Sequence, residues 1–94
     1  MNNPDSQKIV GRFFEAVDIL IQVKAFRGIN TFTTKYDIDR RNFLGNKKDL
    51  SRQFFQPAWL YYLNRDYGVS LEWLINGVGK VFEKNSIYYD TYER

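Results

Sequence analysis

The segment TFTTKYDIDRRNF, residues 31–43, constrains the fold of this chain more than any other stretch. It holds two short amphipathic runs separated by a tight corner at Tyr36-Asp37-Ile38. Four apolar or aromatic residues are spaced so that all can point inward: Phe32, Tyr36, Ile38 and Phe43. Two helices joined by so short a corner form a helix-turn-helix, and we predict that motif here.

The corner carries residues suited to ending one helix and starting the next. Asp37 is at the turn itself, and aspartate tolerates a left-handed backbone better than most residues do. Asp39 is expected to cap the second helix of the motif, because its carboxylate can accept from the free amides there, which stabilises a helix by about 1 kcal/mol. Arg40 and Arg41 then fall in the first turn, where the helix dipole disfavours cations. This small cost hints at a functional reason for the two arginines.

Arg40, Arg41 and Asn42 are expected to point outward from the opening turn of that helix. Arginine bonds the guanine edge bidentately and asparagine bonds the adenine edge, and a recognition helix commonly presents such side chains from its start. We therefore predict that these three residues read base edges in duplex DNA. The alternative is that they form an ordinary solvated helix face.

The net charge of +3 is unevenly placed along the chain. Residues 24–52 hold eight basic and three acidic residues, a balance of +5, and the remainder has a balance of −2. A basic segment of this kind suits a polyanion, although a solvated charged surface is the competing interpretation. The predicted phosphate-contacting residues are Thr31, Thr34, Lys35, Lys47, Lys48 and Arg52.

The helical periodicity of apolar residues, together with Gly, Pro and Ser at the expected helix ends, predicts five helices in all. A long first helix is expected to be capped by Asp5 or Ser6, with Gly28 either ending it or capping the next helix. The helix after the corner should stop early at Gly45 and Asn46, followed by a loop over residues 47–56.

The second half of the chain should add two helices and a tail. Pro57 is expected at the first position of the fourth helix, and Gly68 is expected to close it. Ser70 should cap a fifth helix that ends at Asn76 and Gly77. Its apolar residues are expected to pack inward: Leu71, Trp73, Leu74 and Ile75. Residues 80–94 alternate polar and apolar side chains only loosely and receive no secondary-structure assignment.

Composition bounds the classes of function. The chain has 94 residues, 44% of them hydrophobic and 18% aromatic, so one folded unit is expected. It has no cysteine and no histidine, which removes disulfides, thiolate catalysis, the usual zinc sites and the commonest general base. We expect no enzyme activity, metal or cofactor, and no small-molecule substrate. No segment resembles a membrane span or signal peptide, so the expected location is the cytoplasm.

The corner segment together with YYLNRDYGVSLEWLINGVG resembles the helix-turn-helix domains of the lambda-repressor-like family, also called the xenobiotic-response-element family. The resemblance covers roughly residues 12–79 and implies an all-α, compact five-helix bundle. It further implies sequence-specific binding of double-stranded DNA by a transcriptional regulator of bacterial or mobile-element genes. Thr33 and Asp37 depart from the small alanine and the glycine usual in that family.

The expected organisation is a DNA-binding domain over residues 1–79 and a tail over residues 80–94 that serves docking or self-association. A homodimer is possible, and its half-sites would lie about 34 Å apart. The main alternative function is a protein-interaction module, antitoxin-like or a regulatory adaptor, on the same fold. The aromatic segment FFQPAWLYYL is expected to be core and not a base-stacking surface.

Overall fold

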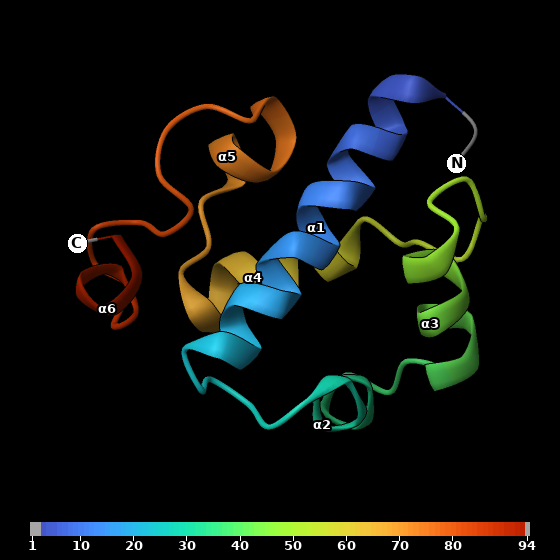
Figure 1. Ribbon diagram of the computed structural model, residues 1–94, viewed down its shortest axis with the longest axis horizontal. Coiled ribbons are helices and arrows are strands. Elements are labelled where there is room, and N and C mark those ends of the chain that lie inside the picture. Colours follow the sequence, from blue (N-terminus) through green and yellow to red (C-terminus); the bar gives the residue numbers. More distant parts are fainter. Residues whose placement is uncertain (1–2, 94) are drawn as a thin grey trace. The chain divides into compact units, whose positions relative to one another are not determined.

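The computed structural model of the protein describes residues 3–93, which form six α-helices (Figure 1). The helices are α1 (Pro4–Gln22), α2 (Ile29–Lys35), α3 (Arg40–Lys48), α4 (Ala58–Tyr67), α5 (Leu71–Asn76) and α6 (Tyr89–Glu93). Within the described residues, β-structure is limited to one isolated antiparallel bridge between Val69 and Phe82. The predicted all-α class is confirmed, and the predicted number of five helices is wrong.

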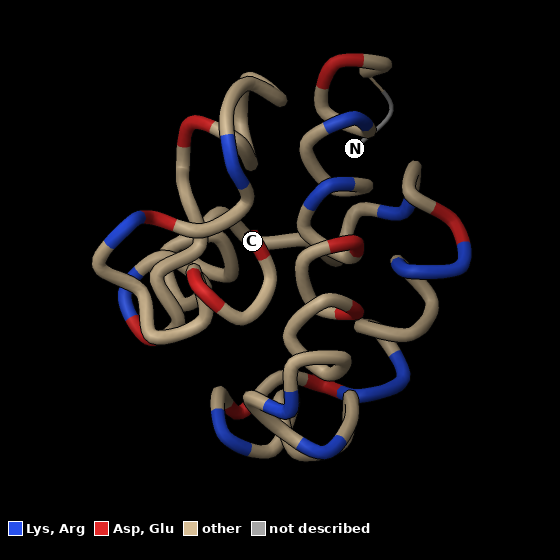
Figure 2. Tube along the Cα trace, turned by 60° about the vertical axis from the view of Figure 1, so that its left-hand side comes forward, with Lys and Arg blue, Asp and Glu red and all other residues tan. Residues whose placement is uncertain are grey.

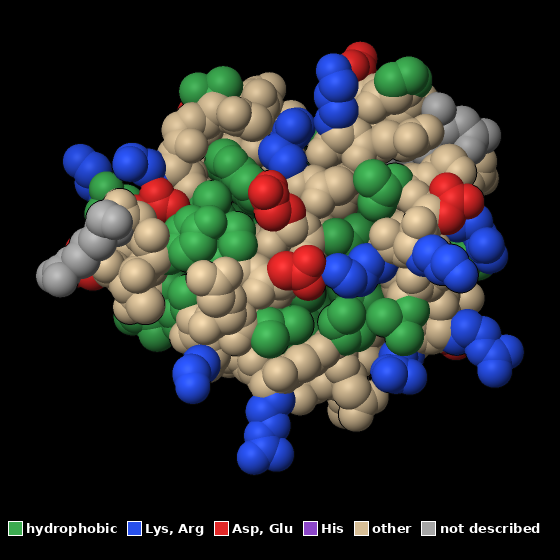
Figure 3. Space-filling model, viewed as in Figure 1, with side chains coloured by type: hydrophobic (Ala, Val, Ile, Leu, Met, Phe, Trp, Pro, Cys, Tyr) green, Lys and Arg blue, Asp and Glu red, His purple; other side chains and the backbone are tan. Residues whose placement is uncertain are grey.

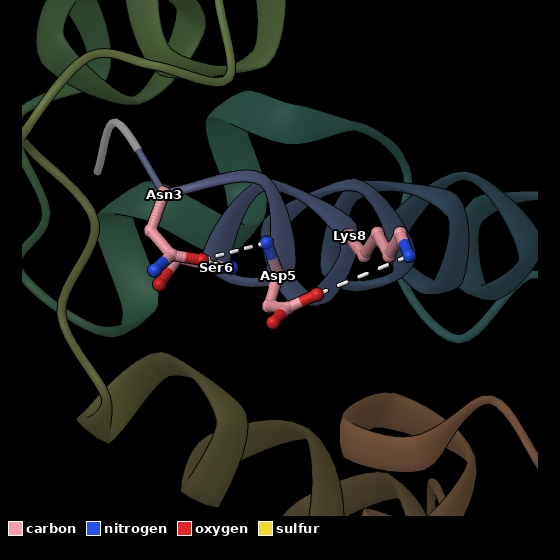
Figure 4. A network of polar contacts seen from close by, with 4 residues as sticks. All are labelled: Asn3, Asp5, Ser6 and Lys8. Atoms are coloured by element: carbon pink, nitrogen blue, oxygen red, sulfur yellow. Dashed lines mark hydrogen bonds and ion pairs between the residues drawn. The ribbon is translucent and has the colours of Figure 1, made fainter.

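Helix α1 begins earlier than the sequence suggested. Asn3, not Asp5 or Ser6, is the N-cap: its Oδ1 accepts from the backbone N–H of Asp5 at 2.7 Å and of Ser6 at 3.4 Å (Figure 4). Pro4 follows at the first helical position, where its fixed φ and missing N–H cost nothing. The Asn-Pro pair is therefore the stronger start signal.

Helix α3 continues past Gly45 and Asn46, where an early stop was expected, and ends at Lys48. The low helix propensity of these two residues is overridden by their tertiary surroundings: the buried Asn46 side chain donates to the Asp49 carbonyl at 3.5 Å, and a Cβ on Gly45 would lie 3.8 Å from the Phe54 ring. Asp49 closes the helix by donating its backbone N–H to the carbonyl of Gly45 at 3.0 Å.

Contacts divide the chain into two compact units, the first ending at Phe55 and the second beginning at Gln56. In the first unit, α1 supplies most of the core, and the Phe13 ring lies at its centre. The ring centroid of Phe13 is 6.2 Å from that of Phe32, 6.0 Å from Phe43 and 5.4 Å from Phe55. One side chain of α1 therefore contacts α2, α3 and the segment after α3.

In the second unit, α4 packs on α5 and the tail folds back onto both. Ser70 donates its N–H to the Val81 carbonyl at 2.8 Å, and the Ser86 hydroxyl donates to the Tyr67 carbonyl at 2.7 Å. The rings of Tyr88 and Tyr92 each lie 5.8 Å from that of Phe82. These contacts explain why α6 forms in a segment whose periodicity was too weak to predict it.

The residues that begin and end α4 and α5 are largely those predicted from the sequence. Gly68 and Gly77 close the two helices in left-handed conformations, and Ser70 caps α5 by accepting from the Trp73 N–H at 3.2 Å. Pro57 lies one residue outside α4, as its N-cap. The expected inward packing of α5 is largely wrong, because only Leu74 is buried in that helix.

Two left-handed glycines of the second unit allow a matched stability test. A Cβ on Gly68 would lie 2.5 Å from the Cβ of Ser86, whereas a Cβ on Gly79 would meet nothing within 4 Å. We expect Gly79→Ala to lower the free energy of unfolding by about 1 kcal/mol, from backbone strain alone. Gly68→Ala should cost about 3 kcal/mol, because overpacking is added. Urea denaturation measures the free energy of unfolding of both variants. Equal decreases in the two variants would contradict the packing of Ser86 against Gly68 at the end of α4.

Candidate nucleic-acid interface

Helices α2 and α3 pack together through phenylalanine rings in tilted and edge-to-face contacts. The Phe32 and Phe43 rings are both fully buried, with their centroids 5.7 Å apart, and each also contacts Phe13 of α1. Thr33 is buried beside them, and its hydroxyl donates to the carbonyls of Ile29 and Asn30 within α2. The buried hydroxyl of Thr33 is therefore satisfied inside its own helix.

The corner between α2 and α3 adopts the predicted local geometry. Asp37 has a φ of 54°, in the left-handed region, and the Ile38 N–H then donates to the Thr33 carbonyl at 2.9 Å. Asp39 is the N-cap of α3, and its carboxylate accepts from the Asn42 N–H at 2.9 Å. Both predictions for this corner are confirmed, and together they fix where α3 starts.

The three predicted base-reading residues occupy different sides of α3. Successive residues of a helix are rotated by about 100°, so Arg40 and Asn42 flank Arg41 on opposite sides. The buried side of the helix is marked by Phe43 and Asn46. Arg41 is exposed and faces away from both, whereas Asn42 is half-buried.

Lys48 shares the exposed side of α3 with Arg41, since seven residues make close to two full turns. Both side chains are exposed, and Leu44 lies between them, half-buried. A rise of 1.5 Å per residue separates the two backbone positions by about 10 Å along the helix. Arg41 and Lys48 therefore lie on the same exposed side of α3, one near each end of the helix.

Lys47 points to the other side of α3, toward α1. Its Nζ lies 3.0 Å from both carboxylate oxygens of Asp18, and its side chain is 30% exposed. A phosphate approaching Lys47 has to compete with this carboxylate. Asp18 is 29 residues away in sequence and gave no signal that it would lie here.

The other predicted phosphate-contacting residues lie on the surface of the first unit. Thr31, Thr34 and Lys35 are exposed on α2, and the Nζ of Lys35 lies 5.4 Å from the centroid of the Tyr36 ring. The guanidinium of Arg52 lies 5.0 Å from the Phe54 ring centroid, in the loop after α3.

Asp49 places one negative charge between the basic residues Lys48 and Arg52. The hydroxyl and the backbone N–H of Ser51 donate to its carboxylate at 2.7 and 3.0 Å, and these bonds lower the pKa of Asp49. The charge of Arg52 lowers that pKa further. Asp49 therefore stays ionised at neutral pH and offsets part of the positive charge between Lys48 and Arg52.

The uneven charge of the sequence coincides with the division into two units. The first unit has ten basic and six acidic residues, a balance of +4, and the second has four basic and five acidic residues, a balance of −1. Basic positions lie at the end of α2, in α3 and in the loops beside them (Figure 2), and several basic side chains project from the surface over α3 (Figure 3). Lys24 and Arg27, between α1 and α2, are also exposed and were missing from the predicted site.

Neither a metal site nor a membrane helix is found within residues 3–93. No three His, Cys, Asp or Glu side chains there are close enough together to hold a metal ion. None of the helices formed by these residues combines the length and the apolar character needed to cross a membrane.

The left-handed corner residue predicts a specific pattern of stability. Asp37→Val should lower the free energy of unfolding by about 1 kcal/mol or more, because a β-branched side chain strongly disfavours positive φ. Asp37→Gly should stay within about 0.5 kcal/mol of the wild type, since glycine adopts this backbone freely but loses more entropy on folding. Thermal unfolding followed by circular dichroism measures the stability of both variants. An Asp37→Val variant as stable as the wild type would contradict the left-handed conformation of Asp37.

Comparison with known proteins identifies no relative of this chain, so the surface is interpreted from its residues. No family model matches the chain, and no match was found among the curated proteins or the solved structures.

Proposed function

We propose that the protein binds double-stranded DNA sequence-specifically, as a transcriptional regulator of the lambda-repressor-like kind. In this proposal α2, the corner and α3 are a helix-turn-helix, and α3 enters the major groove. The observation that carries the proposal is the placement of Arg41 and Lys48 on the exposed side of α3, opposite buried Phe43. A cationic helix face supported by a packed core matches what groove recognition requires.

The residues have separate functions in this proposal. Arg41, which faces directly away from the buried side of α3, is the main base reader. Arg40 and Asn42, on either side of Arg41 around the helix axis, contact bases or sugars. Lys48, Arg52 and exposed residues of α2 contact phosphates, which supply affinity but little sequence preference. Lys47 contributes less, because Asp18 already neutralises it.

A protein-interaction module is the second candidate, and one observation favours it. Leu71 and Ile75 lie one turn apart on α5 and are 37% and 44% exposed, and nearby Val78 is 57% exposed. Exposed apolar side chains grouped in this way often mark protein-binding surfaces. The two candidate functions use different units and can be separated by mutation.

Binding to duplex DNA should depend steeply on salt. If about five phosphates are contacted, the plot of log binding constant against log salt should have a slope near −4.5. Fluorescence anisotropy with random and selected duplexes over a salt series measures this slope. Absence of binding at low salt would reject the proposal, and Leu71→Ser with Ile75→Ser should leave the slope unchanged.

Single substitutions on α3 should separate base reading from phosphate contact. Arg41→Ala should reduce the preference for the selected duplex over random DNA by about tenfold, which corresponds to one good base contact of 1 to 3 kcal/mol. Lys48→Ala should weaken both duplexes equally and reduce the salt slope by about 1. Lys47→Ala should weaken binding less than Lys48→Ala does, and Lys84→Ala in the second unit is the control. Equal effects of Arg41→Ala and Lys48→Ala on preference would contradict the assignment.

A further inference from the structure

The loop between α1 and α2, residues 23–28, has features that DNA binding does not require. Lys24 has a φ of 65°, a left-handed conformation that is uncommon for residues other than glycine. Its N–H donates to the Ile21 carbonyl at 3.0 Å, and the Ala25 N–H donates to the Leu20 carbonyl at 2.8 Å. The chain therefore turns tightly at the end of α1, and strained turns of this kind often accompany binding sites.

This turn forms an open pocket of about 470 Å³, lined by Ile21, Lys24, Phe26 and Arg27. The volume falls within the range of about 300 to 1,000 Å³ that is typical of small-molecule sites. Phe26, only 8% exposed, and half-buried Ile21 make the wall apolar. We call this site the α1–α2 pocket.

The rim of the α1–α2 pocket is cationic. Lys24 and Arg27 are both exposed. Neither forms an ion pair with a carboxylate among residues 3–93, in contrast to Lys8, Lys47 and Arg65. An anionic group placed between them would gain two charge-assisted contacts without first breaking an existing pair.

We propose that the α1–α2 pocket binds a small amphipathic anion, such as a carboxylate with an aliphatic chain or ring. The anionic group contacts Lys24 and Arg27, and the apolar body covers Ile21 and Phe26. A DNA phosphodiester would satisfy the cations alone, because it has no apolar body to place against the Phe26 ring. The combination of an apolar wall and paired cations thus favours a small molecule over a nucleic-acid backbone.

The position of Phe26 connects the α1–α2 pocket to the core of the first unit. Its ring centroid lies 5.3 Å from that of Phe32, which lies 5.7 Å from that of Phe43 on α3. A ligand seated against Phe26 therefore lies two ring contacts away from α3. Bound ligand should alter signals of Phe32 as well as those of the loop.

Octanoate is a suitable probe, titrated into the ¹⁵N-labelled full chain without DNA and followed by amide chemical shifts. We expect saturable shifts at residues 23–28 and at Phe32. Acetate, which lacks the apolar body, and octanol, which lacks the charge, should each bind at least tenfold more weakly. The double variant Lys24→Gln, Arg27→Gln should also bind octanoate at least tenfold more weakly, whereas Lys80→Gln, Lys84→Gln in the second unit should bind as the wild type does.

Three results would overturn the proposal: absence of octanoate shifts in this loop, equal affinity for acetate and octanoate, or unchanged affinity of the Lys24, Arg27 double variant. If that variant weakens DNA binding and octanoate does not bind, the two cations are backbone contacts and the pocket is not a ligand site. The substituted side chains are exposed, so the amide spectrum of the variant should retain its dispersion and verify folding. Because the titration contains no DNA, its outcome is separate from that of the proposed function.

Discussion

The packing of Phe32 and Phe43 against Phe13 is the interaction on which the first unit depends. All three rings are fully buried, and each comes from a different helix. Deleting one large aromatic side chain from such a cluster typically costs about 3 to 5 kcal/mol, a large part of the stability of a small domain. The cluster fixes the buried side of α3, and thereby decides that Arg41 and Lys48 are exposed.

Local interactions determine the backbone of the proposed interface, and long-range interactions determine which of its charges are available. The corner is set locally, by the left-handed Asp37 and the Asp39 cap. The distribution of available charge is set over longer distances, since the pairing of Lys47 with Asp18 leaves Arg40, Arg41 and Lys48 as the exposed cations of α3. Sequence proximity among basic residues therefore does not measure how available they are to a polyanion.

The sequence predicted those features that are encoded within a few residues. The left-handed Asp37, the Asp39 and Ser70 caps and the closing glycines of α4 and α5 all follow from local backbone chemistry. Features that depend on distant partners were missed. The end of α3 lies where Asn46 is buried and donates to the Asp49 carbonyl, α6 packs the Tyr92 ring edge-to-face against Phe82, and the neutralised Lys47 depends on Asp18.

The central claim is that the exposed side of α3 meets DNA, and amide chemical-shift mapping with a selected duplex tests it most directly. The account predicts that the largest shifts fall on residues 40–44, with smaller shifts at Thr34, Lys35 and Lys48, and little change in α5. Shifts concentrated on α5 and Val78, with α3 unaffected, would contradict the account, because they would place the duplex on the second unit. A scrambled duplex at matched salt gives the background from phosphate contacts alone.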